Sequence, residues 1–336
     1  MLVYLFFPFA LIVSSSLGII ISPTWAVAPF IWVLMIVPII DLILPNLNKQ
    51  DNKLNENKLH NIALIIIFPG ILFLVFFGLI KVSQNDISYL EAMALGAAVG
   101  MSGGSIGITT AHELIHRNNK KMRSIGVMLL IICLYGHFRI EHIYGHHKYF
   151  ATKQDPATAR KGENFYFFLF RCVIMSLVSA WNIEKKLLTN KNLSAYNIRN
   201  RMFHYFVAET FLLILAFLIA GINGLIFIFF HSALSIILLE LVDYIQHYGL
   251  ERTKKNGKYE TYSEQHSWNS RHTSANWSTF NLGLHAEHHQ TANRHYPLLS
   301  HQKKIMEMPT NYPVMIMMAL IPPIWFRVMN LKLKKN

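Results

Sequence analysis

Three histidines, His142, His146 and His147, lie within six residues in the stretch EHIYGHHKYFATKQDPATAR, which runs from Glu141 to Arg160. On a helix, residues four apart share a face, and the fifth residue lies beside them. We therefore expect the three imidazoles to converge on one point. A metal ion requires such a set of nitrogen donors, whereas a hydrophobic core does not. This stretch is predicted to be the centre of a polyhistidine metal site.

A second pair of histidines, His112 and His116, is spaced four residues apart in the sequence HELIH. These letters match the His-Glu-x-x-His pattern of zinc proteases, in which Glu113 would be the general base. A five-residue match is weak evidence alone, and the remaining histidine clusters exceed what the zinc of one protease needs. We interpret the pair as part of the larger metal site.

Two more segments complete the constellation. His247 closes an apolar run in DYIQHYGL, and His285, His288 and His289 stand at i, i+3 and i+4 in HAEHH. Together with the earlier clusters they make nine histidines, whereas a single zinc ion takes four ligands. The sequence therefore predicts two ions. Imidazole suits iron, copper, zinc and nickel, and the spacing alone does not choose among these metals.

Acidic residues and one more histidine lie beside the predicted ligands. Metal-bound imidazoles usually donate their other N–H group to a carboxylate or carbonyl oxygen. We expect these neighbours to orient the ligand rings, although simple surface charges are the alternative for each acid. The residues are Glu113, His137, Glu141, Asp155, Asp243 and Glu287.

The composition indicates which class of protein these residues belong to. Of the 336 residues, 53% are hydrophobic and 15% are charged, compared with about a quarter charged in soluble domains. The apolar residues form long runs, which is typical of an integral membrane protein. The first run lacks the positively charged start of a cleavable signal peptide, so we expect a retained span. Cys133 and Cys172 form no disulfide framework or Cys-x-x-Cys metal motif.

The apolar runs predict an all-α polytopic fold, because a membrane span needs about 20 apolar residues. We expect one membrane-embedded catalytic domain, residues 1–336, whose cytoplasmic helical cap comprises residues 116–202 and 249–336. Shorter apolar stretches at Val127–Leu134 and Phe165–Ser179, the latter interrupted by Arg171, are expected to be helices at the cytoplasmic interface. The six predicted spans are residues 2–21, 27–44, 62–80, 90–115, 203–220 and 225–248.

Basic residues in the loops predict the orientation. They follow the second, fourth and sixth spans, and by the positive-inside rule these loops, both termini and every histidine cluster face the cytoplasm. A net charge of +13 also favours anionic lipid headgroups and an acidic electron carrier. It is spread along loops beside the spans, so nucleic-acid binding is not expected. The basic residues are Lys49, Lys53 and Lys58; Arg117, Lys120, Lys121 and Arg123; and Arg252, Lys254 and Lys255.

The histidine segments resemble those of the integral-membrane alkane 1-monooxygenases, within the membrane fatty-acid desaturase and hydroxylase group. The resemblance rests on HELIHR at 112–117, EHIYGHH with ATKQDPATAR at 141–160, DYIQHYGL at 243–250 and LGLHAEHHQ at 282–290. It implies six spans and a cytoplasmic di-iron site held by the nine histidines. It also implies hydroxylation of the terminal methyl group of an alkane by O2, with electrons from NADH through rubredoxin reductase and rubredoxin.

Other functions share parts of this pattern. A lipid desaturase or hydroxylase, or a xylene-type side-chain monooxygenase, would use a similar histidine set on a different substrate. A zinc protease would need only the HELIH pair and one more ligand. A metal transporter would place histidines or acids in the middle of the membrane, whereas these clusters lie at the ends of the predicted spans.

Overall fold

The chain folds almost entirely into helices, as the apolar runs predict. The computed structural model describes residues 2–47, 58–300 and 305–335, and its strands are two residues long. β1 (Lys254–Lys255) pairs with antiparallel β2 (Lys258–Tyr259), and β3 (Trp268–Asn269) pairs with parallel β4 (Met306–Glu307). Lys49 and Lys53, used above to predict orientation, lie outside the described residues, as do residues 301–304 and 336 of the predicted cap.

The helices follow one another with short connections. The first half of the chain comprises α1 (Val3–Ile20), η1 (Pro23–Val27), α2 (Ala28–Ile31), η2 (Trp32–Ile36), α3 (Val37–Ile43), α4 (Lys58–Ile65), α5 (Ile67–Val82), α6 (Tyr89–Ser102), η3 (Gly103–Ile108), α7 (Thr109–Ile115), α8 (Lys120–Ile132), α9 (Phe138–Glu141), η4 (His142–His146) and α10 (His147–Tyr149). The second half comprises α11 (Phe165–Thr189), α12 (Arg201–His247), η5 (Glu264–His266), α13 (Thr273–Ser278), α14 (His285–Gln290), η6 (Tyr296–Leu298), α15 (Tyr312–Ala319) and α16 (Pro322–Lys335).

Six helical stretches among the described residues are long and apolar enough to cross a membrane: Val3–Ile20, Pro23–Ile43, Lys58–Val82, Tyr89–Ile115, Phe165–Thr189 and Arg201–His247. The first four agree with the first four predicted spans to within a few residues. The fifth and sixth predicted spans fall together in α12. The protein is therefore an integral membrane protein with an all-helical fold.

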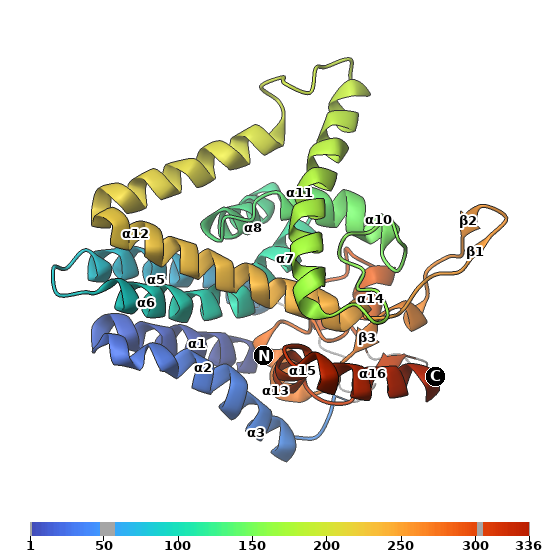
Figure 1. Cartoon of the computed structure of the whole chain (residues 1–336), viewed down its shortest axis with the longest axis horizontal. Helices are drawn as coiled ribbons and strands as arrows, with labels where there is room; N and C mark the ends of the chain where they lie inside the picture. The colour runs from blue at the N-terminus through green and yellow to red at the C-terminus, as the bar shows by residue number, and fades with distance from the viewer. Residues whose placement is uncertain (1, 48–57, 301–304, 336) are drawn as a thin grey trace. The chain divides into compact units, whose positions relative to one another are not determined.

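The long helix α12 is two helices that meet at a sharp corner. Ala220 and Gly221 leave helical geometry, and Gly221 has a φ of +55°, a left-handed conformation that glycine adopts at low cost. Figure 1 shows the chain reversing there, between the two legs of α12. The Asn223 side chain donates hydrogen bonds to the carbonyls of Val82 and Ile87. The corner lies where the sequence predicts the turn between the last two spans.

Helix α11 is longer than the sequence analysis expects. It runs unbroken for 25 residues to Thr189, beyond the predicted end at Ser179, and it is long and apolar enough to cross a membrane, so the expected bounds of this interfacial helix are wrong. Arginine is a good helix former, and the Arg171 guanidinium group binds the Glu163 carboxylate, with 2.7 Å between Nε and Oε1. The ion pair offsets the cost of placing a charge within an apolar segment. Pro322 and Pro323 stand at the start of α16, which follows α15 after a break of two residues.

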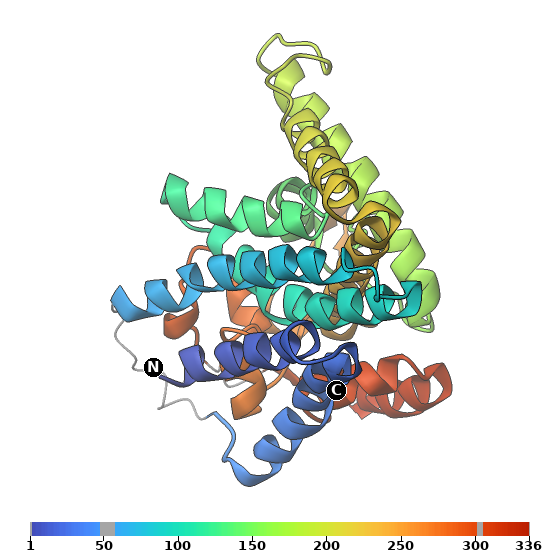
Figure 2. The same ribbon diagram turned by 90° about the vertical axis from the view of Figure 1, so that its left-hand side faces the viewer.

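The chain divides into two compact units. The first consists of the described parts of residues 1–36, 57–139 and 184–239, and the second of the described parts of 37–56, 140–183 and 240–336. In the first unit, α1, α5 and α6 pack side by side, as both views show (Figures 1 and 2). In the second unit, Trp268 is fully buried and its indole N–H donates to the Tyr248 carbonyl at 2.9 Å.

Small residues on α6 set the close packing of the first unit. A Cβ atom on Gly96 would lie 2.4 Å from the carbonyl oxygen of Phe227, and one on Gly100 would lie 2.6 Å from that of His231. Both facing residues belong to the second leg of α12. In lipid, where apolar surface gains little by association, such close approach supplies much of the packing energy between helices. The glycines thus hold α6 directly against α12.

We expect Gly96→Ala to destabilise the protein by about 1–3 kcal/mol, because its methyl group must displace the α12 backbone. Gly107→Ala is the matched control, since the new Cβ would meet its nearest neighbours at 3.6–3.7 Å, an ordinary contact. Thermal unfolding in detergent measures both variants. Equal melting temperatures for the two variants would contradict this account of the packing.

Candidate metal centre

The three histidines at the centre of the sequence pattern lie on a π-helical turn. Residues His142–His146 form η4, between α9 and α10. Because a π-helix brings residues five apart together, His142 and His147 lie on one side while His146 lies on another. The expectation that all three imidazoles converge on one point is therefore wrong, since it assumed the regular spacing of an α-helix. The histidines are shared between two adjacent clusters.

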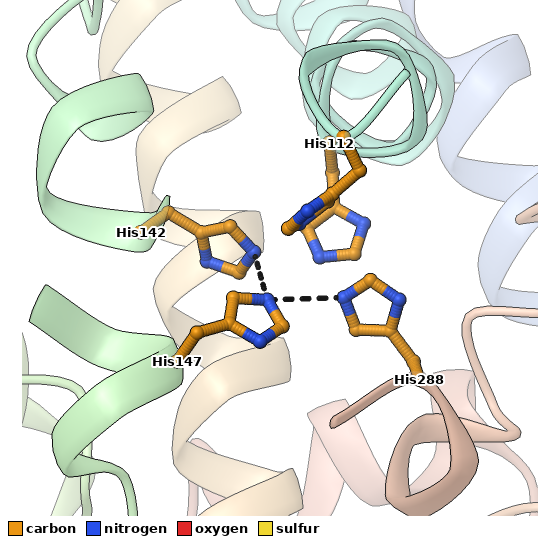
Figure 3. A group of neighbouring side chains, drawn as sticks. His112, His142, His147 and His288 are labelled. Carbon is orange, nitrogen blue, oxygen red and sulfur yellow. Dashed lines mark hydrogen bonds between the residues drawn. The ribbon is translucent and has the colours of Figure 1, made fainter. Parts of the chain in front are cut away.

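The first histidine cluster of the second unit comprises His142, His147 and His288. The Nε2 atom of His147 lies 3.1 Å from Nε2 of His142 and 3.2 Å from Nε2 of His288. Figure 3 shows the three rings pointing toward one another, two from the α9–α10 segment and one from α14. Segments far apart in the sequence thus place three ring nitrogens around one point.

The second histidine cluster comprises His146, His247, His285 and His289, all buried. One ring nitrogen of each lies within 4.8 Å of the others. The Nε2 atom of His285 lies 3.2 Å from that of His247 and 2.9 Å from that of His289. Helix α14 therefore contributes to both clusters, because residues 285 and 289 share its face while residue 288 is turned away from it.

These nitrogen separations fit a shared metal ion better than a hydrogen-bond network. A ring nitrogen carries either one hydrogen or one lone pair, so Nε2 of His285 cannot bond to two neighbouring nitrogens by hydrogen bonds alone. Ligand nitrogens about 2.1 Å from an ion lie roughly 3–3.4 Å from one another. The buried Nε2 of His146 has no hydrogen-bond partner in the described structure. A metal ion could bind this nitrogen in its deprotonated form.

The two clusters are immediate neighbours. The ring centroid of His289 lies 4.9 Å from that of His146, in its own cluster, and 4.8 Å from that of His147, in the other. Burial, followed by the neighbouring imidazoles, lowers the pKa of His289 well below its ordinary value. The ring is therefore neutral, which is the form that binds metals. Each cluster thus gathers nitrogen donors that could hold a metal ion.

Asp155 is the predicted acid that contacts a histidine of the second cluster. Its Oδ2 atom lies 3.0 Å from Nδ1 of His146. Burial disfavours a charged His146 ring, but the Asp155 carboxylate outweighs it and raises the pKa of His146 to about 9, so a metal ion that binds Nε2 has to displace a proton. The carboxylate thereby holds the proton on Nδ1 and leaves Nε2 facing the cluster.

The sequence after Asp155 forms a turn that fixes this carboxylate. The Thr158 hydroxyl donates to Oδ2 at 2.6 Å, and the backbone N–H of Ala157 donates to Oδ1 at 3.1 Å. Thr158 in turn accepts a hydrogen bond from the backbone of Ala151. The DPATAR segment is therefore the support of His146.

The other predicted acids of the second unit occupy different positions. Glu141 is buried beneath the π turn; burial, together with the Asp155 charge, raises its pKa to about 8. A Cβ atom on Gly145 would lie 2.3 Å from this carboxylate, so the histidine segment needs a glycine there. Asp243 is buried one turn before His247 on α12. Glu287 binds Arg294 and the backbone N–H of Ser300, rather than a histidine.

The remaining predicted residues belong to the first unit. His112 and His116 face each other across one turn at the end of α7, with ring centroids 5.3 Å apart. Between them, Glu113 accepts a hydrogen bond from Arg117 at 2.7 Å. His137 packs edge-on against Tyr135, and burial lowers its pKa to about 4.

Phe150 is a site residue that the sequence analysis missed. Its ring stacks on that of His289 with centroids 3.9 Å apart, and Tyr262 packs against its edge at 5.2 Å. The Arg252 guanidinium lies 5.9 Å from the same ring. An isolated phenylalanine after a histidine cluster carries no spacing signal, so only the folded chain shows this contact.

We expect Asp155→Asn to lower the affinity for iron by about 10–100-fold, the usual effect of removing a carboxylate that orients a metal-bound histidine. Metal analysis after equilibration with limiting Fe(II) measures this loss. Glu251→Gln removes an acid from an exposed position and serves as the control. Unchanged iron binding by Asp155→Asn would remove Asp155 from the metal centre.

Comparison with known proteins agrees with the histidine arrangement. Residues 89–317 match the fatty acid desaturase family. The chain is 32% identical to alkane 1-monooxygenase 2 of Pseudomonas aeruginosa over 95% of its own length and 90% of that protein. It is 30% identical to alkane 1-monooxygenase 2 of Alcanivorax borkumensis over 96% of its length and 86% of that protein.

A more distant relative is the hydroxylase component of a xylene/toluene monooxygenase from Pseudomonas putida, which is 27% identical over 76% of this chain and 68% of that protein. The helical membrane fold, the two buried histidine clusters and the extent of the first two matches agree with one another. The chain therefore belongs to the alkane 1-monooxygenase family, within the larger fatty acid desaturase family.

Proposed function

We propose that this protein hydroxylates the terminal methyl group of a medium- or long-chain alkane to a primary alcohol. One oxygen atom of O2 enters the alcohol and the other leaves as water, with two electrons and two protons consumed. The convergence of seven buried or half-buried histidines in two neighbouring clusters carries this proposal. The printed activities of the two most extensive matches described above support the substrate class.

The proposed metal centre uses nine histidines and two iron ions. His112 and His116 would join His142, His147 and His288 at one ion, while His146, His247, His285 and His289 hold the other. The HELIH spacing and the family resemblance support the assignment of the first two. On this view residues 1–336 act as one catalytic domain, with spans and cap as predicted from the sequence. Two iron ions, when bound, supply the activation of O2 and the oxidising power for C–H cleavage.

The protein's own groups prepare this centre. Asp155 fixes the tautomer of His146, and Phe150 covers the ring of His289 so that water has less access. Imidazoles are neutral, so the charge of two bound cations must be balanced by other groups. Asp155 is buried in the same unit, lies against His146 and is placed to offset it.

Electron delivery is proposed to come from rubredoxin, reduced by NADH through its reductase. A basic hairpin supports this route. Lys254, Lys255 and Lys258 are exposed on β1 and β2, and Arg252, at the base of the hairpin, lies over the Phe150 ring. An acidic carrier would be attracted to such a surface. Phe150 would then link the docking surface to His289.

We further propose that the site faces the cytoplasm of a bacterial inner membrane. The distribution of Lys and Arg in the loops supports this orientation. The alkane would enter from the bilayer, where apolar molecules concentrate. Surrounding lipids, but not nucleic acid, would be the other partners.

The relatives described above support two alternative reactions. The xylene/toluene relative favours a side-chain monooxygenase acting on an alkylbenzene, and the desaturase family favours a reaction on an acyl chain. All three functions require the same metal centre and differ in the shape of the substrate site.

A substrate panel distinguishes them. Purified protein given Fe(II), NADH, rubredoxin and its reductase is offered linear alkanes, fatty acids and alkylbenzenes, and the products are identified by mass spectrometry. We expect primary alcohols from the alkanes. Products from the fatty acids or alkylbenzenes alone would overturn the proposed substrate.

The same assay tests the ligands. We expect His146→Ala to lose bound iron and to abolish turnover, because one nitrogen donor of the second cluster is removed. His295→Ala is the control, since His295 is half-buried and belongs to neither cluster. Full activity of His146→Ala would remove this residue from the ligand set.

The basic hairpin can be tested by charge reversal. We expect Lys254→Glu combined with Lys255→Glu to raise the KM for rubredoxin several-fold at low salt, with little change in kcat, because the steering charge is reversed. The difference should shrink as salt is added. Lys185→Glu with Lys186→Glu, an exposed pair on α11, provides the matched control. An equal effect of both pairs would exclude the hairpin as the docking surface.

A further inference from the structure

A cavity of about 440 Å³ in the first unit lies apart from the residues assigned above to the metal centre. It opens between α8, Arg139 of α9 and the first turns of α12. Four cationic side chains contribute to its walls: Lys120, Arg123, Arg139 and Arg201. No carboxylate is among the residues that line it. Such a wall is suited to an anion.

The residues of α8 that line the cavity are regularly spaced along one face of the helix. Lys120, Arg123 and Ser124 occupy its first two turns, and Val127 and Met128 continue the same face one turn later. These positions are i, i+3, i+4, i+7 and i+8, which form a single stripe along a helix. The stripe changes from basic to apolar along its length. A ligand lying on it would need a negatively charged end followed by an apolar part.

Part of the positive charge is not neutralised by the protein. Arg201 binds the buried Glu184 carboxylate at 2.5 Å, whereas Lys120, Arg123 and Arg139 form no ion pair within the part of the chain that the structure describes. Glu209 on α12 accepts a hydrogen bond from the backbone N–H of Gly136 instead. The Glu184 carboxylate also interacts electrostatically with Arg139, so Lys120 and Arg123 are the two cations of the cavity with no carboxylate partner among the described residues.

Arg139 is held in place with donor capacity to spare. Its Nη1 group donates to the Tyr205 hydroxyl at 3.0 Å, which fixes the guanidinium plane. Its Nε atom is buried and has no hydrogen-bond partner in the described structure. An unsatisfied buried donor on a charged group is costly unless a ligand accepts its hydrogen bond. The planar guanidinium matches the oxygen spacing of a phosphate group.

The surface beyond the cavity is apolar. Phe206 is 39% exposed, Val207 69% and Phe211 65%, and all three follow the basic start of α12 by one to three turns. This leg of α12 belongs to a stretch that is apolar enough to cross a membrane. Basic groups at the edge of an exposed apolar helix match a phospholipid, whose phosphate is joined to acyl chains. An acidic protein surface would leave those apolar side chains uncovered.

We propose that this cavity binds the phosphate group of an anionic phospholipid, with the acyl chains lying along the exposed face of α12. Arg139 and Arg123 hold the phosphate, and Lys120 adds charge at the mouth. The attraction follows the general preference of basic segments beside membrane spans for anionic headgroups. The proposal does not depend on the chemistry at the histidine clusters.

The test uses the full chain purified in a neutral detergent. Dihexanoyl phosphatidylglycerol, dihexanoyl phosphatidylcholine and inorganic phosphate are titrated separately, and binding is measured by isothermal titration calorimetry. We expect one phosphatidylglycerol site, with phosphatidylcholine and inorganic phosphate each binding at least tenfold more weakly. Inorganic phosphate binding as tightly as the lipid would overturn the lipid assignment.

Two variants locate the site. Arg139→Gln should weaken phosphatidylglycerol binding about tenfold or more, since it removes a charge-assisted hydrogen bond. Lys120→Glu should have a similar effect while the fold is retained, because an acid is favourable in the first turn of a helix. Lys185→Gln with Lys186→Gln is the control and should bind normally.

Unchanged lipid affinity in folded Lys120→Glu and Arg139→Gln would falsify the proposal. A raised KM for rubredoxin in Lys120→Glu, with unchanged lipid affinity, would instead assign the cavity to the electron carrier. Since no hydroxylation is needed to measure lipid binding, failure of the proposed activity leaves this test intact.

Discussion

The structure depends on holding neutral imidazole nitrogens about 3 Å apart inside a largely apolar protein. When the rings turn their N–H groups outward, the converging nitrogens are all acceptors, so the arrangement is unfavourable unless a cation lies among them. The second histidine cluster meets this condition with four buried rings from α12, α14 and the π turn. Asp155 directs one of these nitrogens, and Phe150 covers another ring.

The π turn is the local device that divides the histidines. A regular helix would direct His142 and His146 to one face, whereas the wider turn pairs His142 with His147. Gly145 and Glu141 fit this turn together, because a side chain at residue 145 would meet the carboxylate. The extra residue in the turn therefore has a chemical consequence: one short segment supplies ligands to two neighbouring sites.

The membrane helices of the first unit are held together by close backbone packing and hydrogen bonds. Glycines on α6 bring helices close together, and hydrogen bonds such as that between Ser15 and Ser102, at 2.8 Å, join α1 to α6. Packing of this kind suits a lipid environment, where burial of apolar side chains does little to hold helices together. It also leaves basic residues at the starts of α8 and α12 exposed to a cavity, and this surplus charge suits an anionic headgroup.

The sequence by itself determined the membrane class, the positions of the first four spans, the corner in α12 and the identity of the histidines, because these depend on local hydropathy, on glycine at a turn and on residue type. It also pointed to Asp155 through its proximity to His146. It could not determine the length of α11, because the helix continues past its apolar run through a polar segment to Thr189. Nor could it divide the histidines between clusters, since helical spacing is inferred from an ideal 3.6-residue turn and the folded chain uses a wider one. The sequence also did not reveal the roles of Phe150 and of the basic cavity. Their roles arise from contacts between segments far apart in the chain, and only tertiary structure decides those.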